Sequence, residues 1–283
     1  LRRQRQMCIR DSNHSDNSLL DGAQNIPSVL ETITDLGMDS VALTEHGNLF
    51  GAVSFYKKAK DNNIKPIIGC EVYVAKGSRF QKDRSSGMGQ YNHLVLIAQN
   101  YQGYKNLMKI VTHGYLEGFY YKPRVDTEIL QKYNEGIICL SACLKGILPE
   151  TLIYNGIDAG KKVAEEYSSI FPGRYYIELQ NHGIPEELQN IQLATRLAKD
   201  MNLPIIATND AHYAKKEHYT AHDVHICIGT GKQLSDKNRL KYHGKEFYFK
   251  SQDEMYSLFK QFPEALENTR ALTDSVDLQI PME

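Results

Sequence analysis

The chain alternates between short, continuous apolar runs and longer segments with helical spacing. The apolar runs have the length of strands and lack the polar alternation of a strand exposed on one face. Strands of this kind, separated by helices, are typical of a parallel sheet covered on both faces. The predicted strands cover residues 40–44, 65–75, 93–99, 136–143, 175–180 and 203–210.

Two of the intervening segments carry clear amphipathic stripes. Val29, Leu30 and Ile33 share one face of segment 27–37, and a similar stripe runs through 185–201. Weaker helical patterns occupy 51–62, 101–113 and 157–170. This alternation of strands and helices predicts a closed α/β barrel. An open doubly wound sheet is the alternative, although no strand is followed by the glycine-rich phosphate fingerprint of that fold.

Three segments depart from the alternation. Residues 76–92 form a polar, Gly/Ser-rich loop that we expect to cover the mouth of a site. Residues 239–251 predict a hairpin around His243–Gly244, followed by helices from about 252 and about 263. We therefore expect a metal-binding barrel over 13–215, and a C-terminal appendage over 216–283 that leads toward a further domain.

Composition limits the classes of function. The formal net charge is −1, so a module that binds nucleic acid through an overall basic field is excluded and any such contact must be local. No apolar run reaches the roughly 18 residues that suggest a membrane span. The five cysteines are an odd number without disulfide-like spacing, and no secretory signal is present. A reduced, cytoplasmic protein without a membrane partner is expected.

Both ends of the chain suggest a piece of a longer protein. Residues 1–12, "LRRQRQMCIRDS", are basic and aperiodic and resemble a non-native leader, so they are excluded from the fold prediction. The final residues, "LQIPME", carry no terminating signal.

Residues able to bind metals follow most of the predicted strands. The carboxyl ends of barrel strands converge on one face, so these side chains could share a pocket. A single His or Asp at a strand end is more often a cap or a hydrogen-bonded core group, but burying this many carboxylates without a cation would be very costly. The residues are His14, Asp21, Glu45, His46, Glu71, His93, Cys143, Glu178, His182, Asp210 and His212, and only His93 opens its strand.

Imidazoles, carboxylates and a thiolate together favour Zn²⁺, Mn²⁺ or Fe²⁺ over Mg²⁺ or Ca²⁺. The set is too large for one tetrahedral ion, so two or three neighbouring divalent ions are expected. Clusters of this kind typically hydrolyse phosphate esters, because the ions activate water and hold the phosphoryl oxygens during in-line attack.

Other polar clusters are weaker candidates. Lys122 and Arg124, in "FYYKPR", could contact the phosphates of a single DNA strand, and solvated side chains are an equal alternative. For the basic, aromatic stretch 237–250, a half-buried hairpin is favoured over a nucleic-acid contact. His218, His222 and His225 have helical spacing but no matching carboxylate, so a second metal site is not expected there.

Several stretches resemble one family. "HSDNSLLDG", "LTEHGNLFGAVSFYKKAK", "IKPIIGCEVYVA", "HLVLIAQN", "EGFYYKPRVD", "LSACLKGILP" and "ATNDAHY" are similar to the N-terminal PHP (polymerase and histidinol phosphatase) domain of bacterial DNA polymerase III alpha subunits, from about residue 13 onward. The resemblance implies a distorted (β/α)₇ TIM-like barrel with a trinuclear metal centre. The implied metal ligands are His14, Asp21, His46, Glu71, His93, Cys143, Asp210 and His212, and His46, Glu71, Asp210 and His212 are expected to act in catalysis.

The same resemblance implies a role in DNA replication. Metal-competent members act as 3′–5′ exonucleases that proofread the primer 3′ end, whereas metal-poor members are structural platforms; a stand-alone PHP phosphatase is a further alternative. The parent chain would be a DNA-directed DNA polymerase whose polymerase core uses Mg²⁺. That core, the sliding clamp and other replicase subunits are the implied partners, and the polymerase core lies outside these residues.

Two positions depart from the family pattern. The family opens with two histidines one residue apart, whereas Ser12 and Asn13 precede His14 here, so the first histidine would fall at the end of the leader. The family usually has Asp where Glu45 stands, and the longer side chain could alter the orientation of the neighbouring His46.

Overall fold

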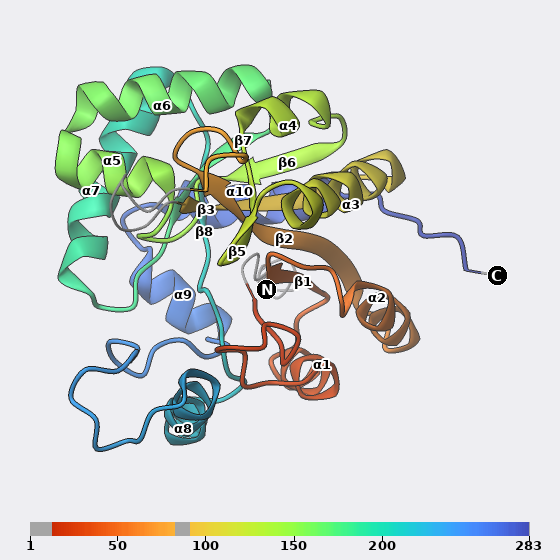
Figure 1. Cartoon of the computed structure of the whole chain (residues 1–283). Coiled ribbons are helices and arrows are strands. Elements are labelled where there is room, and N and C mark those ends of the chain that lie inside the picture. Colours follow the sequence, from red (N-terminus) through yellow and green to blue (C-terminus); the bar gives the residue numbers. More distant parts are fainter. Residues whose placement is uncertain (1–12, 83–90, 283) are drawn as a thin grey trace.

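The computed structural model describes residues 13–82 and 91–282, and the alternation of strands and helices is confirmed (Figure 1). The strands are β1 (Ser40–His46), β2 (Lys65–Ala75), β3 (Tyr91–Ala98), β4 (Phe119–Tyr120), β5 (Lys122–Val125), β6 (Ile137–Leu140), β7 (Tyr175–Leu179) and β8 (Ile205–Ala207). The helices are α1 (Ile26–Asp35), α2 (Ala52–Asp61), α3 (Tyr101–Leu116), α4 (Thr127–Lys132), α5 (Ile147–Asn155), α6 (Ile157–Ile170), α7 (Pro185–Met201), α8 (Tyr219–Thr230), α9 (Gln252–Leu258) and α10 (Pro263–Ser275).

The strands close into a distorted, TIM-like α/β barrel. Hydrogen-bonded pairs run in the order β1–β2–β3–β6–β7–β8. The short β4–β5 hairpin pairs through β5 with the C-terminal part of β2. The segment at Asn13 closes the ring, because it pairs with Ala211 beyond β8 and its carbonyl accepts from the Thr44 amide of β1 at 3.0 Å. Counting that segment, the described part of the ring has seven members, as expected for this fold.

Within the ring, one described strand runs against the expected parallel direction. β3 is antiparallel to both β2 and β6, so the prediction of a wholly parallel sheet is wrong at this strand. The reversal accounts for the position of His93, because the first residues of an antiparallel strand lie at the same rim as the last residues of its neighbours. A histidine that opens its strand therefore reaches the face where the other strands end.

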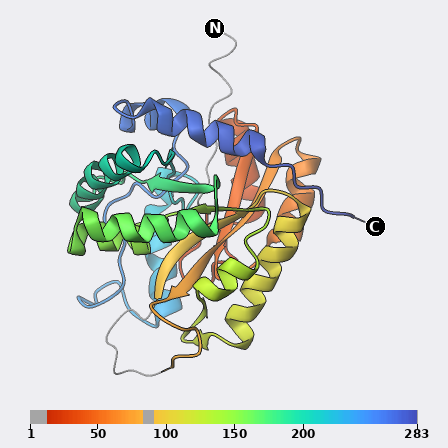
Figure 2. The same cartoon turned by 90° about the horizontal axis from the view of Figure 1, so that it is seen from above.

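The helices other than α8 pack apolar residues against the ring and form an outer layer around it (Figures 1 and 2). In α1 the Asn25 side chain caps the first turn by accepting from the Ser28 amide, and Val29, Leu30 and Ile33 are buried as the sequence stripe predicted. Within the ring, strand residues such as Ile67, Leu96 and Ile138 are almost fully buried, which explains their continuous apolar runs.

Helix α10 covers the end of the barrel where the parallel strands begin (Figure 2). Asn268 donates to the Ile205 carbonyl of β8, Arg270 pairs with Asp39 at 2.9 Å, and the Lys65 ammonium donates to the Thr273 carbonyl at 2.6 Å. The opposite end, where those strands finish, therefore remains available for a site.

The prediction of a hairpin over 239–251 is wrong. This segment forms no strand pair of its own; its backbone follows residues 212–214, with the His212 amide donating to the Phe247 carbonyl at 2.9 Å. Its aromatic residues Tyr242 and Phe247 contact the ring of His212, so side-chain packing holds this segment in place without cross-strand pairing. The helices expected after it are confirmed as α9 and α10.

The loop expected over 76–92 is only partly described. Residues 83–90, its central portion, lie outside the described residues, and β3 begins at Tyr91. No helix within 13–82 or 91–282 has both the length and the apolar character needed to cross a lipid bilayer.

Candidate metal centre

The eight side chains expected to bind metals meet at one rim of the barrel. His46 ends β1, Glu71 lies in β2, and His93 lies near the start of β3. Cys143 follows β6, and Asp210 and His212 follow β8. The remaining two, His14 and Asp21, lie on the segment that closes the ring.

Glu71 is the centre of one group. Its Oε1 lies 3.0 Å from His46 Nδ1 and 2.5 Å from His93 Nδ1. The Cys143 Sγ in turn lies 3.7 Å from His93 Nδ1. A carboxylate, two imidazoles and a thiol therefore face one another across β1, β2, β3 and the turn after β6.

Asp210 is the centre of the second group. Its Oδ1 lies 3.1 Å from His14 Nε2 and 3.8 Å from His212 Nδ1. The His14 ring stacks on the ring of His46 at 3.9 Å and on that of His212 at 4.5 Å between centroids, so the two groups are continuous. Asp21 joins them through His46, whose Nε2 lies 3.4 Å from Asp21 Oδ1.

The backbone is strained in the loop that carries Asp210 and in the loop that carries Cys143. Asp210 has φ 49° and Ala142, next to Cys143, has φ 65°. A residue with a side chain rarely adopts this left-handed conformation, and such outliers concentrate at functional sites. The strain turns Asp210 and Cys143 toward the rim at the points where their strands stop.

The charges at the rim compensate one another. Burial alone would lower the pKa of His46, but Asp21 and Glu71 on either side raise it well above the ordinary value. Burial likewise opposes ionisation of Glu71, and His93 and His46 nevertheless hold its pKa well below the usual range. His46 thus lies between two carboxylates, which favour a positive charge at that point of the rim.

His14 has the opposite tendency. Burial, together with the neighbouring His46 and His212, lowers the pKa of His14 to about 4. It is therefore neutral at physiological pH and has a lone pair for a metal. Burial raises the pKa of the Cys143 thiol, an effect that Glu71 and Asp210 reinforce, so deprotonation there would need a cation.

Glu45 does not join the two groups of candidate ligands, and its side chain instead contacts the loop that carries His14. Its carboxylate accepts from the Ser15 amide at 3.1 Å and from the hydroxyls of Ser15 and Ser18. The Ser18 hydroxyl also accepts from the His46 amide at 3.0 Å and lies 3.4 Å from His14 Nδ1. The longer side chain at position 45 is thus satisfied by two serines that hold the loop carrying His14.

Two other strand-end residues do not join the cluster. Glu178 turns to Gln180 and Thr208, which both donate to its Oε1. His182 Nδ1 lies 2.6 Å from the Glu187 carboxylate, and its Nε2 lies 2.7 Å from the Asn209 carbonyl. Both ring nitrogens of His182 face acceptors, so neither nitrogen is left for a metal.

The two basic residues of the β4–β5 hairpin differ in exposure. Arg124 is only 2% exposed, and its guanidinium donates to the carbonyls of Gly118, Arg79 and Gln81, so it is not presented to a DNA strand as the sequence had suggested. Lys122 is half-buried at the rim, with its Nζ 5.2 Å from the centre of the Tyr73 ring.

Sequence patterns missed Tyr73 and Tyr242. The Tyr73 ring lies 5.4 Å from that of His93, and the Tyr242 hydroxyl lies 2.9 Å from His212 Nε2. Period-two alternation in β2 could have indicated Tyr73, because it lies two residues beyond Glu71 on the same face. No local pattern could have indicated Tyr242, which comes from the segment expected to form a hairpin.

His222 is buried, as the core alternative for this histidine required, and it forms no metal site of its own. Its Nε2 lies 2.9 Å from the Asp21 carbonyl. Burial, with His212 nearby, lowers its pKa to about 4.

The donor atoms fit a cluster of ions. Three groups each have donor atoms within 4.8 Å of one another, namely His14–His46–His212, Glu71–His93–Cys143 and His14–Glu71–Asp210. Donors around one tetrahedral zinc ion lie about 3.3 Å apart, so small movements would suffice. Among the described residues, the buried atoms Asp21 Oδ1, His46 Nδ1 and Glu71 Oε1 have no well-oriented hydrogen bond, as expected where ligand atoms converge.

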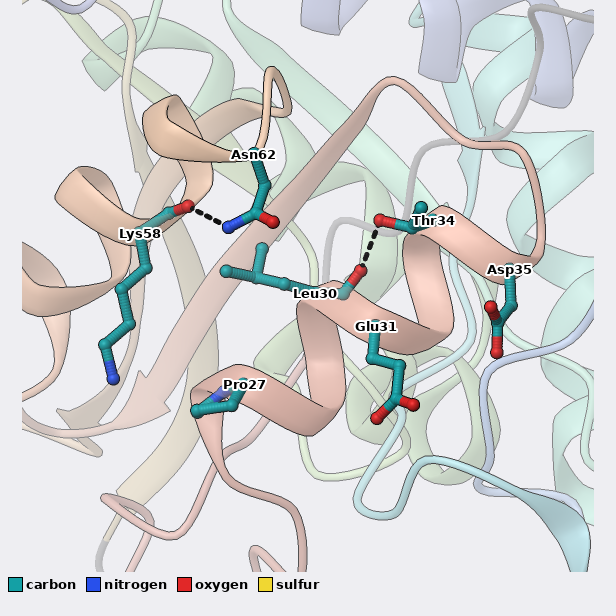
Figure 3. A pocket seen from close by; sticks show the side chains of 7 residues that line it. All are labelled: Pro27, Leu30, Glu31, Thr34, Asp35, Lys58 and Asn62. Atoms are coloured by element: carbon teal, nitrogen blue, oxygen red, sulfur yellow. Dashed lines mark hydrogen bonds between the residues drawn. The ribbon is translucent and has the colours of Figure 1, made fainter.

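A surface groove elsewhere contains none of the eight residues. It lies between α1 and α2 and is lined by Pro27, Leu30, Glu31, Thr34, Asp35, Lys58 and Asn62 (Figure 3). Asn62 donates to the Lys58 carbonyl at 2.7 Å, which ends α2 beside this groove. Its side chains offer no set of soft ligands, so the candidate metal ligands lie at the rim and not in this groove.

Known proteins resemble this chain over most of its length. The family described as the PHP domain matches residues 12–182. The DNA polymerase III alpha subunit of Borreliella burgdorferi is 46% identical over 264 residues, covering 93% of this chain and 23% of that protein. The corresponding subunit of Treponema pallidum is 44% identical over 269 residues, covering 95% of this chain and 23% of that protein. The chain thus spans about a quarter of the length of these relatives.

Proposed function

The chain belongs to the PHP domain family, and from this premise we propose that its rim is a metal-dependent phosphoesterase site that removes nucleotides from the 3′ end of a DNA strand. The observation that carries the proposal is the convergence of eight metal-capable side chains, drawn from residues 14 to 212, on one end of the barrel. An ordinary structural role would not require so many donors in one place.

The proposed ligands are His14, Asp21, His46, Glu71, His93, Cys143, Asp210 and His212. Their mixture of nitrogen, oxygen and sulfur suits two or three Zn²⁺, Mn²⁺ or Fe²⁺ ions. Such ions would supply Lewis-acid activation of water and of the phosphoryl group.

The chain's own residues determine the geometry of the reaction. Glu71 and Asp210 are the buried carboxylates at the centres of the two groups, and they would fix the spacing of the cluster. The His14 ring stacks on both His46 and His212, at 3.9 Å and 4.5 Å between ring centres. We therefore assign the direct catalytic roles to His46, Glu71, Asp210 and His212.

Lys122 is the residue proposed to meet the substrate's phosphates. Within the described residues, no carboxylate lies at ion-pair distance from its ammonium, which rests on Tyr73 beside His93. A cation with no carboxylate partner, one ring away from the ligand cluster, could bind the phosphate that follows the scissile bond. Arg124 serves instead to fold the hairpin that carries Lys122.

The names of the relatives extend the proposal to the whole protein. We propose that residues 13–215 are the catalytic barrel and that 216–283 lead toward the polymerase core of a DNA polymerase III alpha subunit. The proposed partners are the primer 3′ end, that core with its Mg²⁺ ions, the sliding clamp and other replicase subunits, in the bacterial cytoplasm.

A polarity assay tests the activity. The purified chain with Mn²⁺ or Zn²⁺ should shorten a 5′-labelled single strand from its 3′ end in single-nucleotide steps. The Asp210→Asn/His212→Ala variant, which lacks two proposed ligands, is the matched control. Cleavage of a small phosphate ester but of no DNA would favour a stand-alone phosphatase.

A second variant separates an active site from a platform. Ser12→His restores the family's first histidine at a position outside the described residues. If this variant also fails to degrade DNA at saturating metal, the domain is better explained as a structural platform for the polymerase and its exonuclease.

A further inference from the structure

Asp21 differs from the other proposed ligands in what holds it. It lies in the loop between Ser15 and Gly22, on no barrel strand, yet only 7% of its surface is exposed. Besides His46 and its own loop, residues of the C-terminal appendage fix its position. The proposed ligand site is therefore completed by a part of the chain outside the 12–182 family match.

Three contacts join the appendage to the Asp21 loop. The Tyr242 hydroxyl donates to Asp21 Oδ2 at 3.1 Å, and His222 Nε2 lies 2.9 Å from the Asp21 carbonyl. Leu20 packs against Gly229 of α8 so closely that a side chain there would come within 3.2 Å of Leu20 Cδ1. Both the carboxylate and the backbone of Asp21 are thus held by α8 and the segment after it.

Tyr242 is itself rigidly placed. Its ring lies 4.9 Å from that of His212, 4.9 Å from that of His222 and 4.7 Å from that of Phe247. The Phe247 carbonyl accepts from the His212 amide, which fixes the segment against the loop after β8. The hydroxyl therefore has little freedom to move away from the rim.

The Tyr242 hydroxyl has one proton and lies near two acceptors, Asp21 Oδ2 and His212 Nε2. His212 Nδ1 lies 2.9 Å from the Asp210 carbonyl, so in the neutral imidazole Nδ1 carries the hydrogen and Nε2 has the lone pair. Tyr242 lies 2.9 Å from this Nε2 and 3.1 Å from Asp21 Oδ2, and it can donate to only one of them at a time. With the His212 lone pair occupied by metal, Asp21 Oδ2 would be the remaining acceptor for the Tyr242 hydroxyl.

We propose that Tyr242 is a positioning residue of the metal centre, whose hydroxyl holds the side chains of Asp21 and His212 in position to bind metal. The inference rests on the proposed metal binding. It assigns to residues 216–250 the completion of a site that the barrel strands begin. The partners that orient metal ligands typically contribute 10- to 100-fold in metal affinity.

Metal titration of two matched variants tests this role. Tyr242→Phe removes only the hydroxyl and keeps the ring. The control is Tyr167→Phe, because the Tyr167 hydroxyl is also buried but has no hydrogen-bond partner among the described residues. Free Mn²⁺, followed by electron paramagnetic resonance, should show one class of site weakened about 10- to 100-fold in Tyr242→Phe and unchanged in the control.

The melting temperature measured with chelator gives the cost of the lost hydroxyl to folding, which separates that cost from the effect on metal affinity. A double-mutant cycle with Asp21→Asn adds a second readout, since the effect of removing the hydroxyl should largely vanish once the carboxylate is gone. Equal Mn²⁺ affinity in wild type and Tyr242→Phe, or full additivity in the cycle, would overturn the proposal. Absence of Mn²⁺ binding by the wild type would instead refute the proposed function.

Discussion

Replacing Glu178 with Gln should stabilise the protein at neutral and alkaline pH. Glu178 is 1% exposed, its Oε1 accepts from Thr208 and Gln180, and its Oε2 has no hydrogen-bond partner among the described residues. Burial raises the pKa of Glu178 to about 7, against the two hydrogen bonds and with help from the charges of Asp210 and Glu71. The amide keeps the accepting oxygen and removes the ionisable proton.

The magnitude follows from the pKa difference. A carboxyl that titrates near 4.5 when unfolded and near 7 when folded keeps its proton longer in the native state. The free energy of unfolding therefore falls as pH rises from about 4.5 to about 7, by about 3 kcal/mol at 1.36 kcal/mol per pKa unit, and is flat above. Glu178→Gln should recover most of this loss at pH 8 and almost none at pH 4.5.

Urea denaturation of wild type and variant between pH 4.5 and 8.5, with chelator present, measures the difference. Added Mn²⁺ should reduce it, because ions at the rim would offset the charges of Asp210 and Glu71. The reasoning fails if the two proteins differ by the same free energy at both ends of the pH range. Unchanged metal content in the variant is the control that Glu178 is not a ligand.

Two further predictions concern buried charge. The pKa of His14 is lowered to about 4, so between pH 4 and 6.5 the unfolded chain binds a proton at His14 that the folded chain does not bind. With chelator present, the free energy of unfolding should therefore fall by about 3 kcal/mol as the pH drops from 6.5 to 4. Urea denaturation of His14→Gln should show a weaker dependence on pH over this range. Arg124→Met should lower the free energy of unfolding by about 3 kcal/mol, because three buried carbonyls lose a charged donor. Lys122→Met should change the free energy of unfolding by less than about 0.5 kcal/mol and should raise KM for DNA. Equal stabilities of the two variants would contradict a structural role for Arg124 and a substrate-binding role for Lys122.

The barrel and most of its rim could be predicted because both depend on local patterns. Continuous apolar strands and helical stripes are read within short windows, and strand ends in a barrel converge whatever lies between them. That geometry brought Glu71, His46 and Asp210 together from positions far apart in the sequence. The direction of β3 was not predicted, although His93 at its start was the sign of it.

The wrong or missing site predictions have a common physical origin. The sequence alone does not show which polar side chains find hydrogen-bond partners in the protein interior. Arg124 carries a charge typical of a DNA contact, but three carbonyls bind it in the interior. Glu178 lies near the end of β7 and His182 follows that strand, as the proposed ligands do at other strands, yet each is satisfied by neighbours away from the rim. Tyr242 depends on tertiary packing of the appendage, which has no local signature.

Metal content is the most direct test of the central claim that these side chains gather to bind ions. After loading with Zn²⁺ or Mn²⁺ and removal of excess metal, elemental analysis should find two or more ions per wild-type chain, as expected for this donor set. The Asp210→Asn/His212→Ala variant should lose them while keeping its fold. A wild-type chain free of metal, or a double variant that still holds two ions, would contradict the account.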